Sequence, residues 1–457
     1  MEADLGTRRV LSPPGKWPNG PLMTAFTVIF LLLNAAALLA LPRRLALLPL
    51  LVGCCYMTVS QQINAGPVTL TVIRILVAVG IMRVIVRGER VSGGICGMDK
   101  LMLCWAIWLV LSSSLHPGDK APLVFNLGQA FNIGGIYILI RVFCATRDEL
   151  VGIIKLIAWL LLPIALEMVS EHFTGRNMFS IFGGIVQHRD DKFRAVGPFA
   201  HSILAGSVGA ACLPLMVAIW KNNRLPAAVG ITACVMIVIA SNSSGPLMSL
   251  VFGIMAILLW TRREWMRYVR WGIVVMYLLL ELVMDRPAYY IIGEIDLTGS
   301  STGWHRARLI ESCLNHIGEW WLAGTNFTRH WMPTGVSWSP DHCDITNYYV
   351  LMGVFAGLPL VLLFVAMIWT GFVYIGRIMD ETPPEAEGEQ FIIWCVGSAL
   401  FAHTATCISV AYFDQSYIFM FLCLAATASL RMSSMERVSG TEPDAASGEA
   451  AAPSPAC

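Results

Sequence analysis

The sequence predicts an all-α, polytopic integral membrane protein with about 12–13 transmembrane helices and two long external loops. Its 457 residues are 56% hydrophobic and only 13% charged, whereas a soluble globular protein carries about 25% charged residues. The mean hydropathy is +0.66. The apolar residues fall into uncharged runs of about 15–25 residues, the length that spans a bilayer. Only helices satisfy their own backbone hydrogen bonds in lipid at this density of runs.

The apolar runs give the order of the expected helices. They cover residues 21–41, 45–60, 67–86, 101–115, 123–140, 150–169, 202–220, 226–240, 245–260, 271–284, 347–375, 391–412 and 416–430. Residues 1–20 are polar and rich in proline, so we expect a polar N-terminal segment rather than a cleavable signal. Residues 438–457 are rich in Ala, Ser, Pro, Gly and Glu and are expected to be disordered. The part between them, 21–437, is expected to form a single transmembrane domain.

Short loops rich in Lys and Arg predict the orientation, because such loops stay on the cytoplasmic side. The loops with this signal are Arg43–Arg44, Arg87–Arg90 with Lys100, Arg141–Arg147, Lys221–Arg224, Arg262–Arg270, Arg377 and Arg431–Arg437. They alternate consistently, which predicts a cytoplasmic C-terminus and an external N-terminus. Arg8, Arg9 and Lys16 oppose this prediction. A wrongly assigned first hairpin would instead give twelve spans with both ends inside.

Two long segments then lie outside: the first loop, about 170–201, and the second loop, about 285–346. Long loops commonly carry function. In the first loop, Arg194 precedes Gly197-Pro-Phe-Ala-His201 at the mouth of the next span. A cation at the outer membrane boundary suits a lipid phosphate. For Arg189 to Lys192 a solvated, self-paired charge cluster is the favoured interpretation.

In the second loop, an amphipathic helix is expected after Ser300, Ser301 and Thr302, which are good N-caps. The helix face that carries Arg306 continues with Ile310, Cys313 and Ile317. Arg308 and Glu311 fall on another face and can pair there. An unpaired charge on an apolar face is unfavourable, so we expect an anionic group to reach Arg306.

His342 is followed by Asp344 and preceded by Asp341, so a carboxylate could orient its imidazole as a base. An ordinary hydrogen-bonded loop is narrowly the favoured interpretation from these residues alone. Cys313 and Cys343 are the cysteines well inside the external loops. A disulfide between them would close a loop of about 30 residues and stabilise the protein by roughly 3–4 kcal/mol, but two buried thiols explain the residues equally well.

Three further patterns point to one family. They are Arg194-x-x-Gly197-x-Phe199-x-His201, Arg306 with Gly324 eighteen residues later, and Asn347-Tyr-Tyr349-Val followed by Gly357-Leu-Pro-Leu. In order, spacing and placement relative to the spans, roughly residues 190–370 resemble the bacterial O-antigen ligase and O-antigen polymerase superfamily of membrane glycosyltransferases. Two positions depart from its pattern. Ser243-Ser244-Gly245 stands where the family has Ser-Arg-Gly, and Thr346 stands where ligases often have His. The departures favour a polymerase or a divergent ligase over a ligase with a histidine base.

The resemblance implies a reaction on the outer face of the bacterial inner membrane, in surface polysaccharide assembly. A glycan would pass from a lipid (undecaprenyl) diphosphate carrier to an acceptor glycan or lipid, with no cofactor and no metal. The partners are then a lipid-linked oligosaccharide donor, the glycan or lipid acceptor and membrane lipids. The diphosphate-binding candidates are Arg194, Arg306, Lys192, His201 and Asn347, and the catalytic candidates on the acceptor side are His342 and Asp344.

Other functions remain open at this point. A net charge of +1 argues against a nucleic-acid partner. A secondary transporter or a flippase for lipid-linked glycans is the main alternative, because such proteins place charges inside the membrane. Among the few ionisable residues inside the predicted spans are Arg74, Glu167, Glu281 and His403. The first three lie toward the outer ends of their spans, where they would form an ion pair or the rim of an outer cavity. A receptor or scaffold has no feature in its favour.

Overall fold

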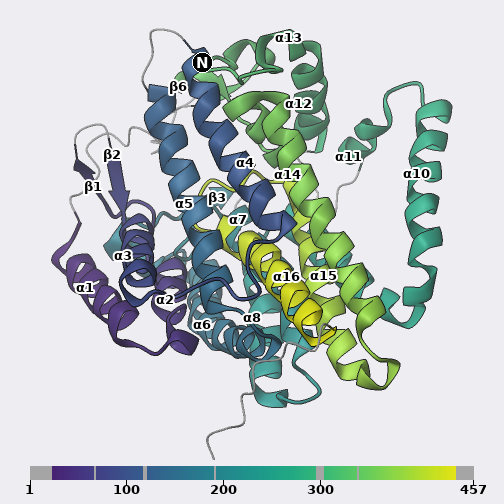
Figure 1. The fold of residues 1–457 in the computed structure, drawn as a ribbon. Helices are drawn as coiled ribbons and strands as arrows, with labels where there is room; N and C mark the ends of the chain where they lie inside the picture. The colour runs from purple at the N-terminus through teal and green to yellow at the C-terminus, as the bar shows by residue number, and fades with distance from the viewer. Residues whose placement is uncertain are drawn as a thin grey trace, which may run out of the picture.

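The computed structural model describes residues 23–65, 68–116, 121–189, 192–294, 303–336 and 339–438. A helix forms in each of the predicted apolar runs, so the all-α prediction agrees with the structure (Figure 1). These helices are α1 (Ala25–Ala40), α2 (Leu48–Tyr56), α3 (Val72–Arg87), α4 (Gly97–Ser112), α5 (Ala121–Phe143), α6 (Arg147–Thr174), α7 (Ser202–Ala218), α8 (Arg224–Ala240), α9 (Ser244–Leu258), α10 (Met266–Val283), α14 (Tyr348–Glu381), α15 (Glu387–Ser409) and α16 (Tyr417–Val438). The polar segment 1–20 and the tail after residue 438 lie outside the described residues.

Shorter elements connect these helices. The α-helical ones are α11 (Ile291–Glu294), α12 (Gly303–Asn315) and α13 (Ile317–Trp320). The 3₁₀ turns are η1 (Arg43–Leu45), η2 (Ser113–Leu115), η3 (Met178–Phe182), η4 (Leu259–Trp265), η5 (Ala288–Tyr290), η6 (Arg329–Trp331) and η7 (Pro384–Ala386). Three antiparallel hairpins pair β1 (Gln62–Ala65) with β2 (Val68–Thr71), β3 (Gln187–Arg189) with β4 (Lys192–Arg194), and β5 (Gly335–Val336) with β6 (Ser339–Cys343).

Several of the helices match the length and composition of membrane spans. In the described part of the chain, 7 helical stretches are long and apolar enough to cross a bilayer, and α1, α7 and α8 are shorter apolar helices. By contrast, α2 has only 9 residues. It rises about 14 Å, less than half of a hydrocarbon core of about 30 Å. The chain therefore has the helices of a multi-pass membrane protein, while the number of crossings remains a prediction.

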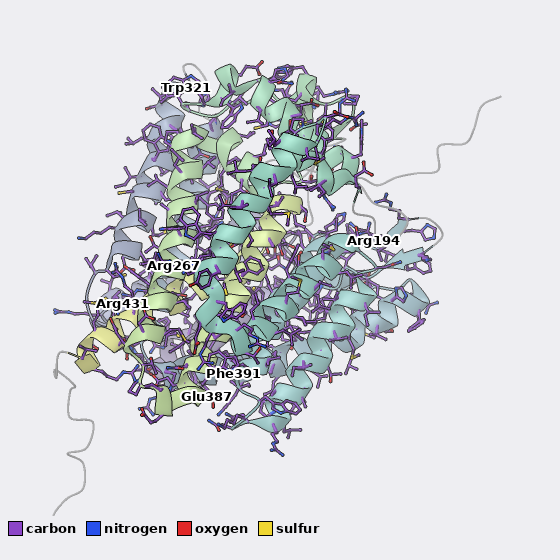
Figure 2. The ribbon with its side chains drawn as sticks, turned by 90° about the vertical axis from the view of Figure 1, so that its right-hand side faces the viewer. Arg194, Arg267, Trp321, Glu387, Phe391 and Arg431 are labelled. Atoms are coloured by element: carbon purple, nitrogen blue, oxygen red, sulfur yellow. The ribbon has the colours of Figure 1, made fainter. Side chains whose placement is uncertain are left out.

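The loops rich in Lys and Arg gather at one end of the bundle. Arg43 donates to the Val142 carbonyl oxygen at 2.7 Å, which joins the loop after α1 to the end of α5. Glu389 forms ion pairs with Arg147 at 2.9 Å and Arg437 at 2.8 Å. In Figure 2, Glu387, Phe391 and Arg431 lie together at this end, and Trp321 of the second loop lies at the other.

The two long loops belong to the opposite end. The Gln415 side chain, in the turn before α16, donates to the Pro198 carbonyl oxygen at 2.9 Å. His116 after α4 lies 3.0 Å from the Ala323 carbonyl oxygen. The Thr24 amide donates to Gln61 at 3.1 Å, so α1 also begins here. Both loops and the start of α1 thus lie opposite the Lys/Arg-rich loops, as the predicted alternation requires.

Two apolar helices show opposite surroundings. Every residue of α16 from Tyr417 to Leu430 is buried, and the helix crosses the middle of the bundle (Figure 1). All of α10 is described, and none of its residues is buried. Its main contacts are with the adjoining turns η4 and η5, and it stands at the edge of the bundle in Figure 1. Because lipid is as apolar as a leucine side chain, such a helix is compatible with a lipid-facing position.

Four of the ionisable residues inside the predicted spans, Arg74, Glu167, Glu281 and His403, have local partners. Arg74 donates to the Asn132 side chain at 3.0 Å. Glu167 accepts from the Met178 amide at 2.9 Å and Glu281 from the Ala288 amide at 2.8 Å. His403 lies 2.9 Å from the Tyr412 hydroxyl. The expected ion pair among the first three is therefore absent from these described residues, because each carboxylate instead accepts from a backbone amide in the turn that follows its helix.

Candidate functional site

Arg194 is the last residue of β4, and its buried side chain reaches the turn before α9. One guanidinium nitrogen, Nη2, donates to the Ser243 hydroxyl. The next amide, of Ala195, donates to the carbonyl oxygen of Ala240 at the end of α8 at 3.1 Å. The backbone contact explains the position of the side chain, because it fixes the end of β4 beside the α8–α9 turn.

Buried polar side chains also hold the segment after Arg194. Glu171 of α6 accepts from the amides of Val196 and Gly197, both at 2.9 Å. Gly197 has a φ of +60°, a conformation that favours glycine. The Asn177 side chain donates to the Gly197 carbonyl oxygen at 3.0 Å, and Asp414 accepts from the Ala200 amide at 2.8 Å. The Arg-x-x-Gly spacing thus corresponds to a turn stabilised by buried acceptors.

His201 caps α7. Its Nδ1 accepts from the Ile203 amide at 3.1 Å, so the proton of the neutral ring is on Nε2. Burial, followed by the charges of Arg194 and Arg189, lowers the pKa of His201 to about 4. The ring is therefore neutral at pH 7, and Nε2–H can donate to an anion without carrying charge. The other candidate in this loop, Lys192, is exposed in β4.

Arg306 lies in the first half of α12 and is buried. Its Nη2 is 3.6 Å from the position that a Cβ of Gly245 would occupy, and the Ser409 hydroxyl is 3.7 Å from the same position. Its Nε has no hydrogen-bond partner among the described residues. Burial, with the nearby charge of Arg189, lowers the pKa of Arg306. Among the described residues, the acidic charge that acts on Arg306 is that of Asp344, and an anionic ligand at Arg306 stays a prediction.

The two predicted diphosphate arginines meet at one turn. Arg194 bonds to Ser243, and Arg306 lies against Gly245, two residues further along. This turn contains the Ser243-Ser244-Gly245 sequence that lacks the arginine of the resembling family. Arg189 belongs to the same electrostatic group, because its charge acts on both His201 and Arg306. Three arginines thus make the site strongly cationic, although Ser244 stands where the similar family has a further arginine.

Asp344 is the acidic side chain of this site. It is exposed to solvent, yet the surrounding protein raises its pKa, while the charges of His305 and Arg306 oppose that rise. The pKa of His305 is lowered by burial, and Asp344 opposes that shift. The charges of Asp344 and His305 thus act on each other, and both act on Arg306 or are acted on by it.

His305 is the residue that the sequence analysis missed. It directly precedes Arg306 in the sequence, and that position is the only sequence signal that could have identified it as a site residue. The predicted imidazole, His342, has its Nδ1 2.9 Å from the Ser339 hydroxyl, and the carboxylate that acts on its pKa is Asp341. Of the two carboxylates that could orient His342, Asp341 is therefore the one that acts on it, whereas the charge of Asp344 acts on His305.

Asn347 has a structural position. Its side-chain oxygen accepts from the amides of Tyr349 at 2.9 Å and Val350 at 3.1 Å, so it caps α14. A capping oxygen is occupied by the first helical amides. As a ligand of the diphosphate, Asn347 would have only its amide nitrogen to offer.

In the second loop the structure differs from two expectations and decides between two alternatives for the cysteines. Arg308 lies over the Trp304 ring at 5.1 Å, and Glu311 accepts from the Tyr290 hydroxyl at 2.6 Å, so these two described residues do not form the expected pair. Ile317 is exposed, because α12 ends at Asn315 and the chain turns before α13. Cys313 and Cys343 are free thiols that are buried in one small cluster rather than bridged.

Two glycines attach the second loop to α14. The helix breaks at Ala356 and Gly357, where φ is −156° and +79°. Across the break, the Leu358 amide donates to the Trp321 carbonyl oxygen at 2.7 Å. A Cβ on Gly357 would lie 2.2 Å from the Leu322 carbonyl oxygen, and one on Gly324 would lie 2.2 Å from the Val354 carbonyl oxygen. The two glycines of the predicted motifs are therefore required by close backbone contact.

No model of a known protein family matches the chain, and no curated protein matches it. The function therefore has to be argued from the chemistry of the two arginines, His201, His305 and Asp344, together with the sequence resemblance.

Proposed function

We propose that the protein is a membrane glycosyltransferase of the O-antigen polymerase or ligase type. It joins a glycan carried on a lipid diphosphate to an acceptor glycan or lipid, at the outer face of the bacterial inner membrane. The observation that carries this proposal is the convergence of Arg194 and Arg306, from two separate loops, on the Ser243–Gly245 turn beside Asp344.

A diphosphate suits the cationic half of this site. Guanidinium groups bind phosphate oxygens in a planar, two-pronged geometry. Two of them from separate loops can each take one phosphate, and the neutral His201 can add a donor. No described residue is a hydrogen-bond partner of the Arg306 Nε, and this supports an anionic ligand, because a buried donor without a partner is unfavourable.

The acidic half suits activation of an acceptor hydroxyl. The acceptor oxygen attacks the anomeric carbon from the face opposite the diphosphate, and its proton passes to the Asp344 carboxylate. The bond between the anomeric carbon and the phosphate oxygen breaks, and the electron pair leaves with the lipid diphosphate. Arg194 and Arg306 stabilise the charge that develops on this leaving group, while His305 acts on the basicity of Asp344.

The lipid part of the donor needs apolar surface near the site. The last turn of α10 provides it: Leu282 is 83% and Val283 78% exposed. This turn leads directly into the second loop, and Glu281 of α10 bonds to Ala288 in η5, which packs on α12. A polyprenyl chain lying along α10 would bring its diphosphate toward the helix that carries Arg306.

Turnover of a polyprenyl-diphosphate glycan by the purified protein in lipid nanodiscs tests the proposal. Arg194→Lys and Arg306→Lys should each reduce turnover about 10–100-fold, because one charge-assisted contact contributes roughly 1.5–3 kcal/mol. Asp344→Asn should reduce it about 100-fold or more. His342→Ala should have a smaller effect than Asp344→Asn.

Arg308→Lys is the matched control, since Arg308 lies on the same helix but is exposed over Trp304. Wild-type turnover in the Arg194 and Arg306 variants, or an equal loss in Arg308→Lys, would reject the proposed diphosphate site. Movement of donor across a vesicle by a protein that never turns it over would favour a flippase. The product then separates the two enzyme types, because a polymerase extends one lipid-linked glycan with another and a ligase transfers it to a different lipid.

A further inference from the structure

A second cluster of ligand-bearing side chains lies in the second loop, away from the arginines. It consists of His316 between α12 and α13, Glu319 in α13 and His330 in η6. One ring nitrogen of each histidine and one oxygen of the carboxylate lie within 4.8 Å of one another. The three residues come from two separate turns of the chain, so the fold, and not a sequence motif, brings them together.

Hydrogen bonds orient two of the three side chains. His316 Nδ1 lies 2.8 Å from the Ser312 carbonyl oxygen. A carbonyl can only accept, so Nδ1 carries the proton and the lone pair of the ring is on Nε2. The Trp331 indole donates to Glu319 Oε2 at 3.2 Å. Metal-binding histidines commonly donate their other ring N–H to a backbone carbonyl, and metal-binding carboxylates are themselves hydrogen-bonded.

Aromatic contacts restrain the two rings. The imidazoles of His316 and His330 meet edge to face, with centroids 4.9 Å apart. Trp331 stacks on His316 at 5.8 Å, and Phe327 stacks on His330 at 5.1 Å. His330 Nε2 lies 3.0 and 2.9 Å from the two oxygens of Glu319. No described residue forms a hydrogen bond with Nε2 of His316, so its lone pair remains for a ligand.

We propose that His316, Glu319 and His330 bind a Zn²⁺ ion. Two imidazole nitrogens and one carboxylate oxygen are a donor set that zinc favours. In a tetrahedral site with bonds of about 2.1 Å, ligand atoms lie about 3.4 Å apart, so modest side-chain rotation closes the cluster around the ion. The ion takes the place of the proton through which His330 Nε2 contacts Glu319, and that proton passes to the solvent or to the ring's Nδ1. Glu319 and His330 have side chains 41% and 38% exposed, so a hydrated ion reaches the site and water fills the fourth position.

The ion would act as a cross-link. It joins the end of α12 to η6, and α12 carries His305 and Arg306 near its other end. Thr328, next to η6, bonds to β6 twice: its amide donates to the Asp341 carbonyl oxygen, and its hydroxyl accepts from the Cys343 amide. The residue that follows β6 is Asp344. Zinc would thus fix the two parts of the second loop relative to each other. This inference does not depend on the proposed transferase activity.

Zinc titration of the full-length protein, purified through a tag without histidine and stripped with a chelator, tests the inference. Competition with a chromophoric chelator should give one Zn²⁺ per chain, and Co²⁺ should give the visible absorption of a tetrahedral site. Zinc should also raise the apparent melting temperature. His316→Ala, Glu319→Gln and His330→Ala should each weaken binding at least the tenfold that losing even an outer-shell contact commonly causes.

His172→Ala is the matched control, because His172 lies at the end of α6, outside the cluster. It should bind zinc like the wild-type protein. Failure of the wild-type protein to compete with the chelator would overturn the inference without any variant. Unchanged zinc affinity in folded Glu319→Gln protein, or an equal loss in His172→Ala, would also overturn it. Zinc binding by a protein that shows no glycosyl turnover would support the metal site and reject only the proposed function.

Discussion

The two loops that supply the candidate site are held in place by different interactions. In the first loop, the segment around Arg194 depends on buried acceptors, chiefly Glu171 and Asp414, that bind its backbone amides. The second loop has an apolar cluster of its own and is attached to α14 by backbone contact at Gly324 and Gly357. The position of Arg194 therefore depends on hydrogen bonds to buried acceptors and that of Arg306 on close packing, so different substitutions should disturb the two residues.

The largest loss of stability is expected from Gly357→Ala, which disrupts the packing of the second loop against α14. The added Cβ would lie 2.2 Å from the Leu322 carbonyl oxygen, at a φ of +79°. Backbone strain of this kind is worth about 1–3 kcal/mol before any clash, so the loss of stability should exceed about 3 kcal/mol. The apparent melting temperature in detergent and protease cleavage within residues 321–325 measure it.

Gly376→Ala in the same helix provides the control for Gly357→Ala. No atom lies within 4 Å of the Cβ position at Gly376, and alanine is the better helix former by about 1 kcal/mol. This variant should melt at the wild-type temperature or slightly above it. Equal melting temperatures for the two variants would show that the backbone contact at Gly357 is unimportant.

Glu171→Ala should have the next largest effect and should act on the first loop. It leaves the amides of Val196 and Gly197 without their shared acceptor, and each buried, unsatisfied amide is worth about 1–3 kcal/mol. Glu171→Gln keeps an acceptor oxygen and should recover most of the stability. Hydrogen exchange should quicken at residues 196–197 in Glu171→Ala and stay unchanged at 321–325. Faster exchange in both places would mean that the loops are not held independently.

The smallest effect is a shift in pH dependence, confined to the second loop. The base proposed for the reaction, Asp344, can accept a proton only when it is ionised, and its surroundings raise its pKa above the usual value of about 4. Turnover should therefore fall as the pH drops through this raised pKa. His305 holds the pKa of Asp344 down, so His305→Ala should move the acid limb of kcat/KM to higher pH. Glu171→Gln should not shift the acid limb. An acid limb that is unchanged in His305→Ala would contradict the electrostatic effect of His305 on Asp344.

The sequence predicts the helices well because hydropathy depends on local composition. A helix lies in each apolar run, and the Lys/Arg-rich loops meet at one end as the orientation rule requires. Hydropathy does not distinguish α16, buried from Tyr417 to Leu430, from α10, which has no buried residue. Both environments are apolar, so the same composition suits either one.

The sequence predicts the cationic residues of the site better than the interaction between Asp344 and His305. Arg306 attracts attention because a charge on an apolar helix face is unusual, and the structure places it at the Ser243–Gly245 turn. His305 has no such signal, because its relation to Asp344 comes from the packing of α12 against the chain after β6. His316, Glu319 and His330 are likewise spread over α13, η6 and the turn between α12 and α13. Contacts between distant segments leave no periodicity that a single sequence can reveal.

The exchanged hydrogen bonds at the break of α14 have one more consequence. The Leu358 amide bonds to Trp321 instead of to its own helix, the Val354 carbonyl accepts from Thr325, and the Ala356 carbonyl accepts from the Trp108 indole at 2.8 Å. Residues 321–325 therefore complete the hydrogen bonding of a helix that is embedded in the bundle. The second loop and α14 should melt as a single cooperative unit. Cutting the chain elsewhere in this loop would leave the attachment intact, whereas pulling residues 321–325 away would expose unpaired backbone groups in the middle of α14.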